Sequence, residues 1–227
     1  MLAVIIMATA PVWALLTFFY VRDRYDKEPR TLLVQLFLQG MLITPVAALV
    51  SLFGIRLLST FLPVDSWLYL LVENFILVAL VEEYLKFQVI WRRAYFHPAF
   101  NEPYDGMIYS ITASLGFATI ENVLYIAQGG PQVALLRGVL SVPGHALFAA
   151  AMGYFVGKAK FTYNGAKAAR YLNQALIIPV LLHGVYDLLL STKHTVLAMG
   201  VVPLSIGMWI MALRQIRLAE QRSPFRP

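Results

Sequence analysis

Five ionisable side chains lie inside long apolar stretches of this chain, where an electric charge is costly. An ionised carboxylate in the hydrocarbon of a bilayer costs about 2.5–3.5 kcal/mol even on permissive insertion scales. Such groups are retained where they meet one another or line a polar cavity, so they predict an intramembrane catalytic centre or a proton or ion pathway. The five residues are Glu82, Glu83, Glu121, His145 and His183.

Two adjacent carboxylates and a lysine share the third apolar stretch. Residues three and four positions apart lie on one face of a helix, so Lys86 can reach Glu83 or Glu82. The two glutamates point about 100° apart and therefore face different neighbours. Carboxyl groups in unlike environments can divide the roles of general acid and general base. Alternatively, the cluster marks a shallow, wet helix end, because Arg92 and Arg93 follow closely.

The fourth apolar stretch carries a single carboxylate among apolar residues. Phe117 and Glu121 are one helical turn apart, and Asn122 follows directly. This spacing places an aromatic ring and a carboxyl group on one helix face. Alternatively, Glu121 lies at the outer interface and bonds Asn122 or Tyr125, because Gly-Gly-Pro at 129–131 ends the helix soon afterwards.

The two histidines occupy the fifth and sixth stretches. His145 directly follows Pro143-Gly144, a sequence that disturbs the helix ladder and permits close backbone approach. His183 and Asp187 form an i, i+4 pair, in which a carboxylate fixes the imidazole tautomer and raises the basicity of its other nitrogen. The alternative for both histidines is a structural hydrogen bond within the packed helices.

Two chemistries fit this set of side chains. Glu121, His145 and His183 are candidate metal ligands, because two histidines and one glutamate form a known catalytic zinc set. Without a metal, a glutamate would act as general base on water, and the histidines would stabilise the oxyanion. The sequence does not decide whether zinc is the cofactor. A proton- or ion-coupled transporter could use the same groups as a relay, although no internal repeat of the transporter type is present.

The composition is that of a polytopic membrane protein. The chain has 227 residues, of which 59% are hydrophobic and 13% charged, against about 25% charged in soluble domains. It has no cysteine, which excludes disulfides and cysteine-ligated zinc. About 20 apolar residues span a bilayer as a helix. We therefore predict an all-α, single-domain transmembrane bundle over residues 1–227 with seven spans: 2–21, 31–53, 67–90, 105–127, 133–157, 171–190 and 195–213.

The basic residues fall mostly in one set of loops. Fourteen of the eighteen lysines and arginines follow the first, third, fifth and seventh stretches, whereas Arg56, Arg137 and Lys193 belong to the opposite side. Lysine and arginine are enriched on the cytoplasmic side of membrane proteins. This bias predicts an external N-terminus and a cytoplasmic C-terminus, and it gives no reason to expect a nucleic-acid partner.

At these motifs the chain resembles the PrsW family of bacterial intramembrane proteases. It is more distantly similar to the CAAX-prenyl-endopeptidase and bacteriocin-processing group. Glu82 to Lys86 matches the Glu-Glu-x-x-Lys motif, Phe117 and Glu121 match Phe-x-x-x-Glu, and His183 and Asp187 match His-x-x-x-Asp. His145 matches an additional histidine, and the loop 23–29 is of the family type.

The resemblance implies a peptidase in the bacterial cell membrane that acts on a membrane protein. Well-known relatives make the first extracytoplasmic cut in a single-pass anti-sigma factor. The CAAX-type relatives usually have arginine at the position of Lys86 and histidine at that of Glu121, so their metal-free mechanism does not transfer directly. By motif, the catalytic set would be Glu82, Glu83, His183, Glu121 and His145, supported by Lys86, Phe117, Asn122 and Asp187.

Overall fold

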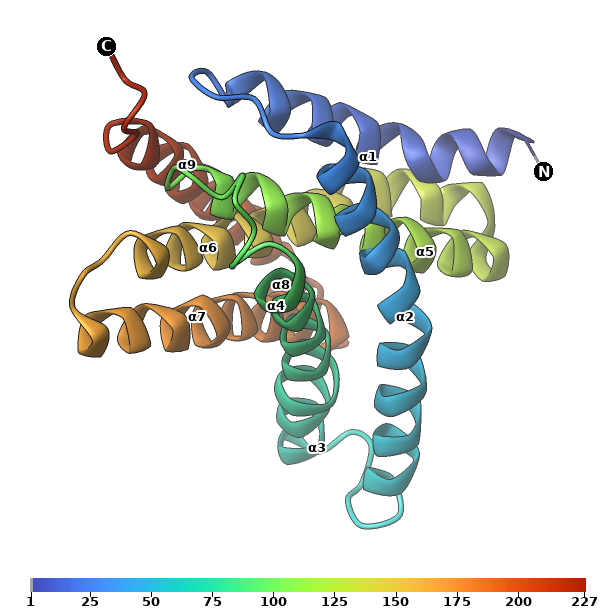
Figure 1. Cartoon of the computed structure of the whole chain (residues 1–227). Helices are drawn as coiled ribbons and strands as arrows, with labels where there is room; N and C mark the ends of the chain where they lie inside the picture. Colours follow the sequence, from blue (N-terminus) through green and yellow to red (C-terminus); the bar gives the residue numbers. More distant parts are fainter. Residues whose placement is uncertain (1) are drawn as a thin grey trace.

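The computed structural model describes the backbone of residues 2–227, together with all side chains in that range except those of residues 2–5, 8 and 131. This part of the chain contains helices and no strands, which confirms the predicted all-α class (Figure 1). Each predicted span coincides with a helical segment. The elements are α1 Leu2–Arg22, α2 Arg30–Leu58, α3 Trp67–Leu71, the π-helix η1 Val72–Leu80, α4 Val81–Arg93, α5 Asp105–Leu136, the π-helix η2 Arg137–Ser141, α6 Val142–Lys160, α7 Gly165–Ser191, α8 Thr195–Met199 and α9 Val201–Glu220.

Five helices between residues 2 and 227 are long and apolar enough to cross a membrane. Helix α1 and the continuous α3–η1–α4 segment cover the remaining two predicted spans. The count of seven spans and the orientation of the termini stay predictions. The five helices are Arg30–Leu58, Asp105–Gly130, Gln132–Lys160, Gly165–Ser191 and Thr195–Glu220.

Helices α5 and α6 form the centre of the bundle. In the most apolar windows of their two spans, 78% and 67% of residues are buried, against 17% for the α2 span. The two helices touch through backbone, because a Cβ built on Gly153 would overlap the carbonyl oxygen of Gly106. A Cβ on Gly157 would overlap the carbonyl oxygen of Pro103, which lies just before α5. Small residues allow this close approach where no hydrophobic force draws helices together in lipid.

The chain reverses direction at one glycine. Gly130 has φ +75°, a conformation that residues with a Cβ rarely adopt, and it divides the α5 element into two limbs. The limb after Gly130 continues through η2 into α6 and packs back against the first limb. Residues at equal distances before and after Gly130 therefore lie side by side.

Helix α2 and the α3–η1–α4 segment run side by side and cross the direction of α5, α6 and α7 (Figure 1). Segment η1 packs against α7, where a Cβ on Gly184 would overlap the ring of Phe75. Ser191 Oγ also donates to Asn74 Oδ1 at 2.9 Å. These contacts hold the start of α4 against α7. Short π-helical segments frequently accompany functional sites.

Candidate functional site

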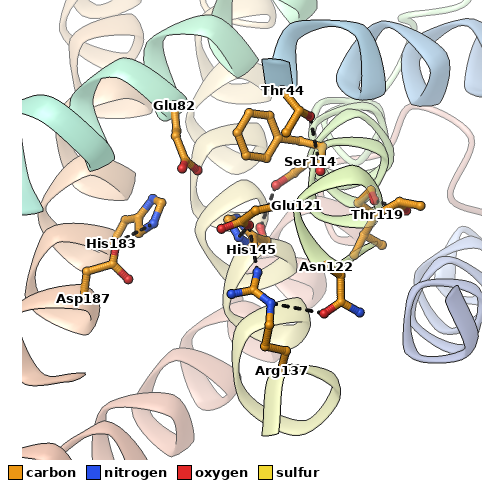
Figure 2. A network of polar contacts seen from close by, with 12 residues as sticks. Thr44, Glu82, Ser114, Thr119, Glu121, Asn122, Arg137, His145, His183 and Asp187 are labelled. Carbon is orange, nitrogen blue, oxygen red and sulfur yellow. Dashed lines mark hydrogen bonds and ion pairs between the residues drawn. The ribbon is translucent and has the colours of Figure 1, made fainter. Parts of the chain in front are cut away.

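The polar residues of four apolar helices come together next to the end of η1. In Figure 2 the side chains of Glu82, His183, His145 and Glu121 are turned toward one another. Helix α4 supplies the two glutamates and the lysine, α5 supplies the third glutamate, and α6 and α7 supply the histidines. The structure thus gathers the five ionisable residues with which the sequence analysis began.

Lys86 lies at the centre of this group and is only 1% exposed. Its Nζ atom is 3.1 Å from Glu82 Oε2, 2.8 Å from Glu83 Oε1 and 3.1 Å from His145 Nδ1. The ammonium also lies 4.3 Å from the centroid of the Phe117 ring. Two carboxylates and an aromatic face compensate the desolvation of a buried cation. This explains why the Phe117 motif position carries an aromatic side chain.

Glu83 is completely buried and joins α4 to α7. Its Oε1 atom accepts from Lys86 and lies 3.0 Å from His183 Nδ1. The other nitrogen of His183 lies 3.1 Å from Asp187 Oδ2, as the i, i+4 spacing predicts. The second oxygen of Glu83, Oε2, is buried without a hydrogen-bond partner. One carboxylate oxygen is therefore used for positioning, and the other remains available for a ligand.

Glu121 is held by a histidine and an arginine. Its Oε2 atom lies 2.7 Å from His145 Nε2 and 3.0 Å from Arg137 Nη2. Arg137 Nε donates to Asn122 Oδ1 at 3.1 Å, and its guanidinium carbon lies 4.0 Å from the centroid of the Tyr125 ring. The interface partners considered for Glu121 from sequence, Asn122 and Tyr125, both contact this arginine.

Sequence reasoning missed Arg137, which it counted among the basic residues of the outer side. In the structure Arg137 begins η2 and reaches back to the first limb of α5, as Figure 2 shows. A signal was present in the sequence. A turn at Gly130 places residue 137 opposite residue 123, which is next to Asn122. A lone arginine inside an apolar stretch needs a polar or acidic partner, and this turn supplies one.

Three of the clustered side chains could hold a metal ion. Ligand atoms from Glu82, Glu83 and His183 lie within 4.8 Å of one another, and all three residues are buried. The metal candidates named from sequence were Glu121, His145 and His183, so only His183 is common to both sets. Carboxylate and imidazole donors suit zinc, and the partnerless Oε2 of Glu83 is an oxygen that such an ion would satisfy. The residues therefore fit a metal.

A family model described as "PrsW family intramembrane metalloprotease" matches residues 28–213 of the chain. The chain belongs to this PrsW family. The match covers most of the sequence, including the Glu-Glu-x-x-Lys, Phe-x-x-x-Glu and His-x-x-x-Asp motifs and His145. It confirms the predicted intramembrane peptidase and does not favour the transporter.

Relatives with the PrsW name are similar to the chain over nearly their whole length. Proteins named "Protease PrsW" from Geobacillus kaustophilus and Halalkalibacterium halodurans are 38% and 37% identical, over 97% of this chain and 93% and 99% of their own lengths. The Bacillus subtilis protein of that name is 33% identical over 97% of both chains. No solved structure matches the chain. This PrsW-family chain is therefore a membrane-embedded peptidase whose substrate is a membrane protein.

Proposed function

We propose that this chain hydrolyses a peptide bond of a single-pass membrane protein at the site built by Glu82, Glu83 and His183. The observation that carries the proposal is the meeting of these three buried side chains within 4.8 Å. Placing three polar groups of two helices in one apolar interior is costly unless they act together. We further propose that the enzyme works in the bacterial cell membrane as one catalytic domain over residues 1–227.

Glu82 is better placed than Glu83 to accept a proton from water. Glu82 is 8% exposed and accepts one hydrogen bond from Lys86, whereas Glu83 is fully buried and shares one oxygen between Lys86 and His183. A general base has to reach the water that it activates. In this proposal Glu82 takes the proton, while Glu83 and Asp187 hold His183 from opposite sides for the tetrahedral stage.

The same three side chains would hold a divalent metal ion. Such an ion would supply Lewis-acid chemistry, which lowers the pKa of a water molecule and polarises a carbonyl group. The chain's own contribution would be orientation. Asp187 accepts a hydrogen bond from Nε2 of His183, and this bond leaves Nδ1 to face the site. Elemental analysis of purified protein would test this: we expect bound zinc or another transition metal in wild type, and its loss in His183→Asn.

The proposed substrate class follows from the membrane location and the family resemblance. A regular helix hides its carbonyl groups in internal hydrogen bonds, so the cleaved segment has to unwind before water can attack. We propose a single-pass anti-sigma factor or a similar regulator, with this enzyme making the first cut. A substrate of that kind presents one flexible segment at the membrane edge beside its helix.

The test is cleavage of a tagged single-pass protein by co-expressed variants. We expect Glu82→Gln, Glu83→Gln and His183→Asn each to reduce cleavage by at least about 100-fold. The first substitution removes the general base, the third removes the imidazole that assists at the tetrahedral stage, and the second removes the carboxylate that positions this imidazole. Glu73→Gln is the matched control, because Glu73 lies in the first turn of η1 and is not one of the three clustered residues. Undiminished cleavage by the Glu83 and His183 variants would reject the assignment.

A further inference from the structure

A polar cavity of about 210 Å³ opens between the ends of α6, α7 and α9. On the same volume scale a single water molecule needs about 10–15 Å³, so the cavity has room for a group much larger than water. The residues that line it include two cations, Lys158 and Arg222, and the hydroxyl-bearing Tyr154, Tyr171 and Thr162. No carboxylate is among the lining residues.

Both cations lack an ion-pair partner in the part of the chain that the structure describes. Lys158 is held by aromatic rings instead: its Nζ atom lies 4.3 Å from the centroid of the Tyr171 ring and 5.3 Å from that of Tyr154. Its ammonium is thereby fixed beside the cavity. Arg222 also lines the cavity and is exposed.

The cavity is separate from the peptidase site. Lys158 follows His145 by thirteen residues on the same helix, which is about 20 Å at 1.5 Å per residue. Tyr171 precedes His183 by twelve residues of α7, about 18 Å by the same arithmetic. The cavity therefore lies near the ends of the spans on the side that the positive-charge bias assigns to the cytoplasm.

We propose that this cavity binds the phosphate group of a glycerophosphate ligand, supplied by an anionic phospholipid such as phosphatidylglycerol. Two uncompensated cations, hydroxyl groups and the absence of carboxylates give the cavity the chemistry of an anion site. Its position at the helix ends is where headgroup phosphates lie, and basic pockets between membrane helices on this side bind such lipids. Lys167, an exposed cation in the first turn of α7, does not line the cavity.

The experiment uses the full-length protein purified in neutral detergent. Native mass spectrometry would count retained phosphatidylglycerol, with phosphatidylcholine as the zwitterionic comparison. Thermal unfolding with added lipid would measure its affinity. We expect selective retention of phosphatidylglycerol and at least tenfold weaker binding in Lys158→Gln/Arg222→Gln. The matched control is Lys167→Gln/Arg226→Gln, which removes the same charge from exposed positions outside the cavity.

A separate arm adds sn-glycerol 3-phosphate or inorganic phosphate in place of lipid. Stabilisation by these soluble anions alone, lost in Lys158→Gln/Arg222→Gln, would support the phosphate site and reject the lipid as its source. Equal weakening in the two double variants would overturn the proposal, because it would indicate diffuse surface charge. Absence of binding by every phosphate compound would overturn it as well. Arg222→Gln alone keeps the test valid if the double variant does not fold, because Arg222 is exposed.

Discussion

The Nζ atom of Lys86 lies 3.1 Å from Nδ1 of His145, so an ammonium from α4 meets an imidazole from α6. An ammonium has only donors, which makes Nδ1 the acceptor and leaves the imidazole proton on Nε2. That N–H then donates to Glu121 Oε2 at 2.7 Å. The lysine therefore selects the tautomer of a histidine on another helix, and through it orients the carboxylate of a third.

We expect Lys86→Gln to abolish cleavage and to destabilise the protein by about 3–5 kcal/mol, the usual cost of breaking a buried ion pair. The substitution leaves Glu82 and Glu83 facing each other without a cation. Unfolding in detergent and the cleavage assay would measure both effects. Lys193→Gln is the control, because its ion pair with Asp65 is exposed and should contribute little. An unchanged unfolding transition in Lys86→Gln would contradict this account.

Contacts within one helix were predictable from sequence, because helical spacing determines them. Lys86 meets Glu82 and Glu83, and His183 meets Asp187, as their separations of three and four residues require. The helices themselves were predictable for a similar reason: runs of about 20 apolar residues have few alternatives in a bilayer. Helical spacing alone therefore accounts for these three pairs of the site.

Contacts between helices were not predictable, since they depend on how each helix is rotated and where it crosses its neighbour. One such contact is the pair of His183 with Glu83, where the sequence analysis had grouped His183 with Glu121. Glu121 instead pairs with Arg137, which the reversal at Gly130 brings close to it, so the candidate metal ligands differ from those expected. The π-helical form of η1 was also missed, because a shift from i+4 to i+5 bonding leaves the apolar composition unchanged.

Arg137 acts as a positioning residue for Glu121, and we expect Arg137→Gln to lower kcat about 10–100-fold with little change in KM. The loss would come from a carboxylate that no longer aligns His145. Arg137→Lys should recover part of the activity by charge, yet it cannot bridge Glu121 and Asn122 together. Kinetics with a fluorogenic peptide in detergent would separate kcat from KM. Arg56→Gln is the control on the same predicted side, and equal effects of both substitutions would argue against a local role.

The buried acidic residues of the loop 23–29 should make stability depend on pH. Desolvation, reinforced by Glu102, raises the pKa of Asp23 to about 7, and desolvation likewise raises that of Glu28 to about 7. The folded protein therefore retains protons that the unfolded chain, with ordinary values of 3.8 and 4.5, releases. The contribution of these two groups to stability is therefore greatest at low pH, falls as pH rises from about 4 to 7, and then levels.

Thermal unfolding of the detergent-solubilised protein across pH 4–9 would measure this dependence. In Asp23→Asn/Glu28→Gln we expect a flatter profile and a higher midpoint above pH 7 than in wild type, because neither side chain has to lose a proton. Asp65→Asn is the control, since Asp65 is exposed. A wild-type midpoint that rises from pH 5 to pH 8 would contradict the prediction.

Backbone contact between α5 and α6 should make Gly153 intolerant of even one methyl group. A Cβ there overlaps the Gly106 carbonyl, which belongs to the neighbouring helix and cannot rotate away. Because α6 carries His145, separating the helices also moves the site, so Gly153→Ala should lose both stability and cleavage. Gly207→Ala in α9 is the matched control: nothing lies within 4 Å of its Cβ position, and alanine there should stabilise the helix by about 0.5–1 kcal/mol. Equal unfolding midpoints for the two variants would show that α5 and α6 are not in backbone contact.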